Sequence, residues 1–190
     1  MDPLRKRLVT EATRQFVERG FDGTSMREIA DACGVTKAAL YYHYAGKADV
    51  LRDIVTTYLD ELADVMTSGR GAASGAADQL GAIVRGLFGL PVESRAIMRL
   101  AMHDLRHLND PDKDAFAAAY QARFLQPLED VIAQGMRSGE FAPRNPATVL
   151  WMVLGMLYPF FSSADRGQDD QVVADLLAVM LSGLLSRPGS

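Results

Sequence analysis

The chain has 190 residues, of which 48% are hydrophobic and 23% are charged, a composition typical of a folded globular protein with a sizeable core. A formal net charge of -4 excludes a uniformly basic nucleic-acid coat protein, and a single cysteine excludes an internal disulfide, which suits a reducing compartment. Residues 1–12 lack the apolar core of a signal peptide, and residues 148–164, the nearest approach to a membrane span, are short and contain Pro159. We therefore expect a cytoplasmic protein with no membrane span.

Three helices are predicted in the first 46 residues. Apolar residues recur at helical spacing through residues 3–19. Ser25 and Glu28 have the spacing of a capping box, which predicts a second helix that ends at Gly34. Thr36 can cap a third helix of about two turns. Two short helices joined by a glycine turn are the outline of a helix-turn-helix.

The rest of the chain is also predicted to be helical. The main break in composition is the small-residue stretch 68–77. Apolar periodicity predicts helices near 47–68, 78–90, 94–108, 112–138, 146–165 and 170–186. Pro127 and Pro159 should kink or split the helices that contain them. The predicted fold class is all-α, with a helix-turn-helix domain at 1–46 and a helical domain at 47–190 that starts with a connecting helix.

The third predicted helix has two unlike faces. Leu40 and Tyr44 lie four residues apart and can pack inward on the second helix. The other side carries basic, aromatic and small residues, namely Lys37, Ala38, Tyr41, Tyr42 and His43. Such a face suits the major groove, because small residues permit close approach while hydroxyl and basic groups reach phosphates and base edges. Lys47 begins the next helix, where the dipole disfavours a cation, and this indicates a phosphate ligand.

The run GFDGTSMREIADACGVTKAALYYHYAGKADVL, residues 20–51, resembles the TetR family of one-component transcriptional repressors. The resemblance covers roughly the first quarter of the chain, with the LYYHY centre and the lysine three residues later as its most specific features. It assigns the DNA contacts to Thr24 or Ser25, Thr36, Lys37, Ala38, Tyr41, Tyr42, His43 and Lys47. Tyr44 stands where the family usually has Phe, so its hydroxyl needs a partner or solvent. The resemblance also implies a dimer that binds a palindromic operator and a second domain that binds a small molecule.

Residues 78–186 contain many aromatic residues and methionines but no strong motif. Most of these must form the core, although a ligand cavity between helices would have the same lining. The candidate ligand residues are Phe88, Met98, Met102, His103, Tyr120, Phe124, Trp151 and Met152. Polar residues among them are further candidates, namely Arg95, Arg99, Asp104, Arg123 and Gln126. The predicted effector is a largely apolar small molecule, and no cofactor is predicted.

Two histidines raise the possibility of a metal site or an enzyme. His103 and His107 have the i, i+4 spacing that can bind one metal ion, but no third ligand is evident, so no metal site is predicted. An enzyme that uses His103, Asp104 and His107 is one alternative function, although the chain has no phosphate loop, nucleophile elbow or zinc signature. A second alternative is a DNA-binding regulator that is controlled by a protein partner and has no small-molecule ligand.

The last predicted helix is apolar nearly all round. One chain has too little surface left to cover every side of it, so such a helix is normally buried against a partner as well. We predict a homodimer through helices 146–165 and 170–186, which agrees with the four-helix interface that the resemblance implies. The favoured function is therefore a homodimeric, ligand-responsive transcriptional repressor, located in the cytoplasm and associated with the nucleoid.

Overall fold

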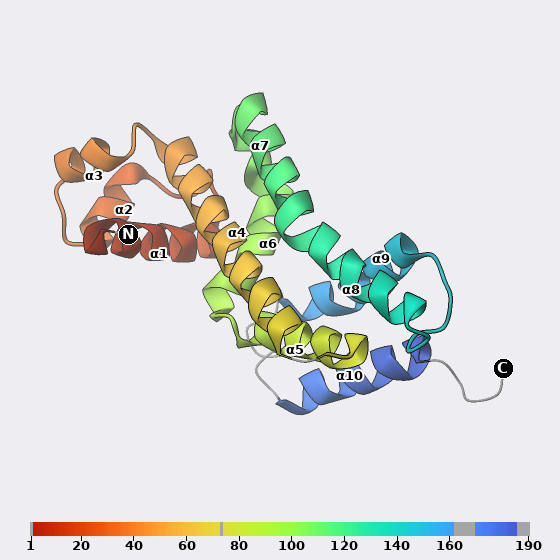
Figure 1. Ribbon diagram of the computed structural model, residues 1–190. Coiled ribbons are helices and arrows are strands. Elements are labelled where there is room, and N and C mark those ends of the chain that lie inside the picture. Colours follow the sequence, from red (N-terminus) through yellow and green to blue (C-terminus); the bar gives the residue numbers. More distant parts are fainter. Residues whose placement is uncertain (1, 73, 162–169, 186–190) are drawn as a thin grey trace. The chain divides into compact units, whose positions relative to one another are not determined.

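The computed structural model describes residues 2–72, 74–161 and 170–185, except for the side chains of residues 99, 102, 103 and 161. Within these ranges the regular structure is helical, apart from one isolated bridge between Phe141 and Leu185, so the all-α prediction is confirmed (Figure 1). None of the helices in these ranges is long and apolar enough to cross a membrane. The chain divides into two compact units, and each is described by itself.

The first unit contains the residues up to Tyr58 and the segment Glu93–Ala117. Its elements are α1 (Pro3–Arg19), α2 (Met26–Ala32), α3 (Lys37–His43), the first part of α4 (Lys47–Gly71), α6 (Val92–Asp104), the 3-10 turn η1 (Leu105–His107) and most of α7 (Asp110–Tyr120). Helix α2 packs on both α1 and α3. The three helices predicted for the first 46 residues are therefore present, and they form the predicted helix-turn-helix.

The second unit contains Leu59–Val92 and the residues from Ala118 onward. Its elements are the remainder of α4, α5 (Ala76–Gly89), the π-helical segment η2 (Gln121–Leu125), α8 (Gln126–Arg137), α9 (Pro146–Phe161) and α10 (Asp170–Leu184). Helix α5 packs against α8 and α10, and α9 packs against α8. The helix predicted at 146–165 is present as far as Phe161, and its residues 162–165, like residue 186 of the last helix, lie outside the described residues.

Side-chain caps decide where the short helices of the helix-turn-helix begin. The Ser25 hydroxyl accepts a hydrogen bond from the Glu28 amide at 3.2 Å, while the Glu28 carboxylate accepts one from the Ser25 amide at 2.8 Å. The Thr36 hydroxyl accepts from the Ala39 amide at 3.1 Å. Between the two helices, Gly34 has a φ of 64°, a conformation that favours glycine. Both predicted caps are thus confirmed.

A network of three side chains joins α1, the end of α3 and α4. Arg5 donates to both carboxylate oxygens of Asp53, at 2.8 and 2.6 Å, and the Tyr44 hydroxyl donates to the same carboxylate at 2.5 Å. Burial by itself raises the pKa of Asp53, but the hydrogen bonds from Arg5 and Tyr44 outweigh it, so the pKa lies below its ordinary value. The carboxylate is therefore ionised at neutral pH and holds both donors. The Tyr44 hydroxyl has found the partner that it needed.

The segment 93–117 belongs to the same compact unit as α1, α2 and α3, which the predicted domain boundary after residue 46 did not anticipate. The rings of Phe21 and His107 stack with their centroids 4.2 Å apart. Arg52 on α4 donates to Asp112 on α7 at 3.0 Å. Aromatic stacking and an ion pair thus fasten η1 and α7 to the helix-turn-helix.

Two glycines set the distance between α4 and α5 in the second unit. A Cβ atom at Gly69 would lie 2.5 Å from Cγ1 of Ile83, and one at Gly86 would lie 2.9 Å from Cγ1 of Val65. Because real Cβ atoms do not approach so closely, a larger residue at Gly69 would force the helices apart. The small-residue content of this region therefore serves close helix packing.

Residues 112–138 do not form the single helix that the periodicity predicts. They are divided among α7, η2 and α8, and the π-helical segment ends two residues before Pro127. A proline lacks an amide hydrogen and its ring crowds the carbonyl four residues earlier, so a wider turn before Pro127 relieves both problems. The division expected at Pro127 is confirmed. Pro159, in contrast, lies inside α9, which continues to Phe161 without a break.

We expect Tyr44→Phe to lower the free energy of unfolding by about 1.5 kcal/mol, because it removes a hydrogen bond to a buried, ionised carboxylate. Chemical denaturation measured by circular dichroism checks this value. Tyr42→Phe is the matched control, since Tyr42 is 87% exposed and its loss of a hydroxyl should leave stability unchanged. Equal stabilities of the two variants would show that the Asp53 network contributes little.

Candidate nucleic-acid interface

The outer face of α3 is exposed as the sequence predicts. Thr36, Lys37 and Ala38 are exposed, Tyr41 is 44% exposed and Tyr42 is 87% exposed. The inner face carries Leu40 and Tyr44, which are 0% and 5% exposed. A two-turn helix with one buried edge can therefore present its other edge to a groove without losing its own packing.

The exposed side chains of α3 contact one another. The Lys37 ammonium lies 5.5 Å from the centroid of the Tyr41 ring, a cation–π distance. The Tyr42 and His43 rings meet edge to face with centroids 5.4 Å apart. These contacts limit the number of conformations of the basic and aromatic groups before any ligand arrives, which lowers the entropy cost of binding.

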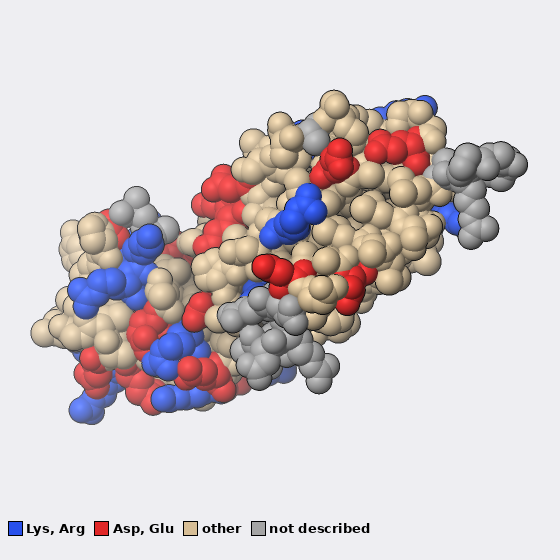
Figure 2. Space-filling model, turned by 90° about the horizontal axis from the view of Figure 1, so that it is seen from below, with Lys and Arg blue, Asp and Glu red and all other residues tan. Residues whose placement is uncertain are grey.

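A hollow of about 550 Å³ lies between the start of α2, α3 and the start of α4. It is lined by Asp22, Gly23, Thr24, Ser25, Met26, Arg27, Glu28, Lys37, Tyr41, Gly46 and Lys47. The structure thus brings Ser25, Lys37, Tyr41 and Lys47, all predicted DNA contacts, around one concave surface. Figure 2 shows basic and acidic side chains intermixed over the end of the molecule formed by α1, α2 and α3, so any anion is met by local cations rather than by a uniform field.

The two hydroxyl residues before α2 have different environments. Thr24 is 2% exposed, and its hydroxyl lies 3.3 and 3.2 Å from the carbonyl oxygens of Gln15 and Gly20. Ser25 is exposed, and its oxygen only accepts from Glu28, so its hydroxyl hydrogen can be donated outward. Both residues line the hollow, and both assignments stay predictions. Because the Thr24 hydroxyl is enclosed and already engaged, Ser25 is the residue whose side chain is free to donate to a phosphate.

Lys47 has a structural contact as well as a place in the hollow. Its ammonium donates to the Phe21 carbonyl oxygen at 2.7 Å and lies 4.5 Å from the centroid of the Phe21 ring. This bond holds the start of α4 against the turn after α1. An ammonium has three donors, so the group can hold Phe21 and bind a phosphate at once.

The basic run at residues 5–7 is largely committed to the fold. Arg5 binds Asp53, and Arg7 donates to the Cys33 carbonyl oxygen at 2.5 Å. Lys6 is exposed and makes no ion pair with any residue that the structure describes. The sequence alone could not separate Lys6 from its two neighbours, because the distinction depends on which partners α4 and α2 bring near.

The candidate ligand residues do not gather around one described cavity. Phe88 and Phe124 are buried in the second unit, where Tyr120 also lies with its hydroxyl 3.1 Å from that of Tyr158. Met98 is buried in the first unit, and the side chains of Met102 and His103 lie outside the described residues.

Two of the candidate ligand residues lie on the surface. Trp151 and Met152 are 56% and 63% exposed, so they do not line an enclosed pocket of a single chain. Neither residue lines a described hollow, and their assignment as ligand contacts stays a prediction. Both lie on a part of α9 that the other described residues do not cover.

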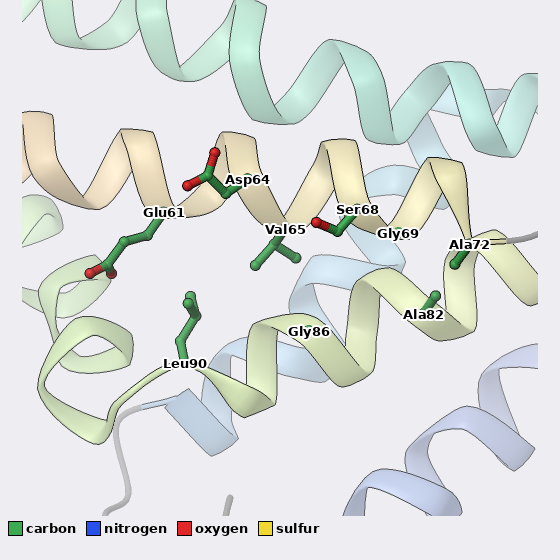
Figure 3. A pocket seen from close by; sticks show the side chains of 9 residues that line it. All are labelled: Glu61, Asp64, Val65, Ser68, Gly69, Ala72, Ala82, Gly86 and Leu90. Carbon is green, nitrogen blue, oxygen red and sulfur yellow. The ribbon is translucent and has the colours of Figure 1, made fainter.

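An open groove of about 480 Å³ runs between α4 and α5 in the second unit (Figure 3). It is lined by Glu61, Asp64, Val65, Ser68, Gly69, Ala72, Ala82, Gly86 and Leu90. None of the predicted ligand residues is among these. Glu61 and Asp64 place carboxylates at one part of the groove, and most of the other lining residues are small or apolar.

The structure describes the His107 side chain but not that of His103, so only the described parts of the chain bear on a metal centre. No three side chains of the types His, Cys, Asp and Glu gather there in a way that could hold an ion. The His107 Nε2 atom lies 3.7 Å from a carboxylate oxygen of Asp104 and stacks on Phe21. His107 therefore has a packing role between η1 and the turn after α1.

Two family models match the chain. The model of bacterial regulatory proteins of the tetR family matches residues 8–54, and the model of the tetracyclin repressor-like C-terminal domain matches residues 73–160. The HTH-type transcriptional repressor KstR2 of Rhodococcus jostii is 24% identical over 194 residues, which cover 96% of this chain and 91% of that protein.

Solved structures share the fold over nearly the whole length. The ketosteroid transcriptional regulator KstR2 of Mycobacterium tuberculosis has a TM-score of 0.84 and 21% identity, with 98% of this chain and 97% of that chain covered. AibR in complex with isovaleryl coenzyme A and operator DNA has a TM-score of 0.80 and 24% identity, with 93% and 97% covered. The matched proteins are regulators, which excludes the enzyme alternative. The chain, with its exposed recognition face on α3 and the two family models along most of its length, belongs to the TetR family of DNA-binding transcriptional regulators.

Proposed function

We propose that the protein is a homodimeric repressor that binds a palindromic operator and is released from it by a small molecule. The observation that carries this proposal is the contrast between the two faces of α3, with Leu40 buried and Tyr42 almost fully exposed. The proposal places α3 in the major groove, where Thr36, Lys37, Ala38, Tyr41, Tyr42 and His43 contact DNA. Ser25 and Lys47 contact flanking phosphates. The protein acts in the cytoplasm, bound to the nucleoid.

An unpartnered apolar surface supports the dimer. On α9, Trp151 and Met152 are exposed beside Gly155, and on α10, Val179 is 63% exposed. Figure 2 shows the molecule from the side on which α10 lies in Figure 1, and the surface of the second unit there is mostly free of charged side chains. Such a surface buried against a second copy would form a four-helix interface of α9, α10 and their partners. The dimer would set two recognition helices about 34–36 Å apart, which is one turn of DNA.

The link between effector and operator is proposed to run through α6 and η1. These elements share a compact unit with the helix-turn-helix, and the stacked pair of His107 and Phe21 is one direct contact between them. Phe21 also accepts the hydrogen bond from Lys47, so a displacement of η1 would disturb both the turn before α2 and the start of α4. By linkage, an effector can weaken operator binding only by the difference of its affinities for the two states, typically about 1–3 kcal/mol.

The effector's chemistry can be approached through the similar structures. AibR was solved with isovaleryl coenzyme A, which makes short acyl thioesters a reasonable first class of compounds to screen. A regulator controlled only by a protein partner would bind the operator and ignore these compounds. A mobility shift with and without them therefore separates the two functions.

We expect Tyr42→Phe to weaken operator binding by about 1 kcal/mol, because it removes one hydrogen bond to the DNA backbone and nothing in the fold. Lys37→Ala should weaken binding and, if the ammonium meets a phosphate, reduce the slope of log affinity against log salt by about one. Fluorescence anisotropy with labelled operator at several salt concentrations measures both. Lys113→Ala on α7 is the charge-matched control, since Lys113 pairs only with Asp110 among the described acidic residues. If the wild type and the three variants bound the operator with identical affinities, Tyr42 and Lys37 would not be DNA contacts.

We expect Val179→Arg to produce a folded monomer, because a charge buried at a symmetric interface opposes association while the exposed position tolerates it in the free chain. Operator affinity should fall with the loss of the dimer. Leu177 is a poorer target, since it is 8% exposed within its own chain and an arginine there would oppose folding. Sedimentation of Val179→Arg beside Thr67→Arg on α4 tests the assignment. If Val179→Arg and Thr67→Arg both formed dimers of equal stability, α10 would not be part of the interface.

We expect His107→Ala to leave effector binding intact while it reduces effector-driven release of the operator, because the stacking contact between η1 and Phe21 is lost. Calorimetry with an effector from the thioester screen measures binding, and anisotropy measures release. Lys113→Ala on α7 is the control, because Lys113 pairs with Asp110 and makes no described contact with Phe21 or His107. Full release in His107→Ala would show that the signal reaches α3 by another route.

A further inference from the structure

Arg95 on α6 is a buried cation, and two nitrogen atoms of its guanidinium lack hydrogen-bond acceptors among the described residues. The residue is 3% exposed, and its Nε and Nη1 atoms are enclosed with no hydrogen-bond acceptor among the described residues. Burial lowers the pKa of Arg95, and the nearby Glu93 opposes this shift only in part. A guanidinium nevertheless stays charged in proteins, so the group is a positive charge that the surrounding side chains do not neutralise.

Three partly exposed arginines of the chain contrast with Arg95. Arg5, Arg52 and Arg123 are between 38% and 48% exposed at their side chains, and each forms an ion pair with an aspartate at 3.0 Å or less. These three arginines, which water can also reach, are paired, while the buried Arg95 forms no ion pair with a described carboxylate. A buried donor left unsatisfied costs its full desolvation free energy, so a persistent one indicates a ligand that completes it.

The position of Arg95 in its helix points to the same conclusion. Arg95 is the fourth residue of α6, which begins at Val92, so it lies in the first turn of a 13-residue helix. The helix dipole disfavours a cation in this turn and favours an anion. An anion held by Arg95 would satisfy the guanidinium and would be favoured by the amide groups of the turn as well.

We propose that Arg95 binds an anionic group of the effector, a carboxylate or a phosphate. The planar guanidinium can donate two parallel hydrogen bonds to either group, which fixes orientation as well as supplying affinity. This inference rests on the proposed ligand response and changes its chemistry, because the sequence alone predicted a largely apolar effector. It also places the anion on α6, the helix that continues into η1 and so to the Phe21 contact.

The first test asks whether Arg95 has an internal partner. Arg95→Met removes the guanidinium and keeps an unbranched apolar side chain in place of the arginine stem. Arg14→Met on α1, where Arg14 is exposed and paired with Glu11 and Glu18, controls for the lost charge. Without ligand, the melting temperature of Arg95→Met should equal or exceed that of the wild type, because an uncompensated buried charge is removed. A melting temperature several degrees below both other proteins would show that Arg95 is a structural residue and would overturn the proposal.

The second test asks what Arg95 binds. Wild type, Arg95→Met and Arg14→Met are each titrated with isovalerate, coenzyme A, isovaleryl coenzyme A, methyl isovalerate and sodium sulfate, with sodium chloride at matched ionic strength as the reference. At least one anion should bind wild type and Arg14→Met ten-fold or more tightly than Arg95→Met. Isovalerate as that anion would identify a carboxylate, and coenzyme A would identify a phosphate. Methyl isovalerate should not distinguish the three proteins.

The outcomes separate this inference from the proposed function. Equal responses of wild type and Arg95→Met to every anion, including no response from either, would overturn the assignment of Arg95. Operator binding by ligand-free Arg95→Met should match that of the wild type, since Arg95 is not on the DNA-contacting face. A wild type that binds no palindromic DNA would instead defeat the proposed function, whatever the anion titrations show.

Discussion

The buried carboxylate of Asp53 is the interaction on which the DNA-binding part of the structure depends. A helix as short as α3 is not stable alone, because nucleation costs more than two turns of hydrogen bonds return. Tyr44 at its end and Arg5 on α1 both bind Asp53, so three helices share one desolvated anion. Two hydrogen-bond donors around one carboxylate add a directional constraint to the non-directional apolar packing of Leu40.

The same logic extends from the helix-turn-helix to α6 and α7. The stacked pair of Phe21 and His107 and the ion pair between Arg52 and Asp112 join segments that are far apart in the sequence. A regulator needs such a junction, because an effector can act on DNA only through elements that change together. Phe21, which stacks on His107, also accepts a hydrogen bond from Lys47 through its carbonyl oxygen, and Lys47 lines the hollow. Lys47 therefore has a packing role in the fold and is also a predicted DNA contact.

The net charge of the chain does not show how charged and apolar side chains are distributed over its surface. An overall charge of -4 is compatible with DNA binding because the charge is not spread evenly, and Lys37 and Lys47 lie around one hollow of the first unit. Trp151 and Val179 expose apolar area that a monomeric protein would rarely carry, which suits a second copy. Arg95 shows the reverse condition, a charge enclosed by the fold, and we propose an anionic group of the effector as its partner.

The sequence by itself determined the helices, because caps and apolar periodicity are local properties. Ser25 and Thr36 mark the helix starts, Pro127 marks a break, and the alternation of Leu40 and Tyr44 with exposed residues marks the recognition face. Tertiary structure decided which similar residues differ in role. It buried Thr24 and left Ser25 and Trp151 exposed. It paired Arg5 with Asp53, whereas two nitrogen atoms of Arg95 have no hydrogen-bond acceptor among the described residues. It also joined residues 93–117 to the first helices. The reason is that burial and partners depend on segments distant in the chain, whose approach no local pattern encodes.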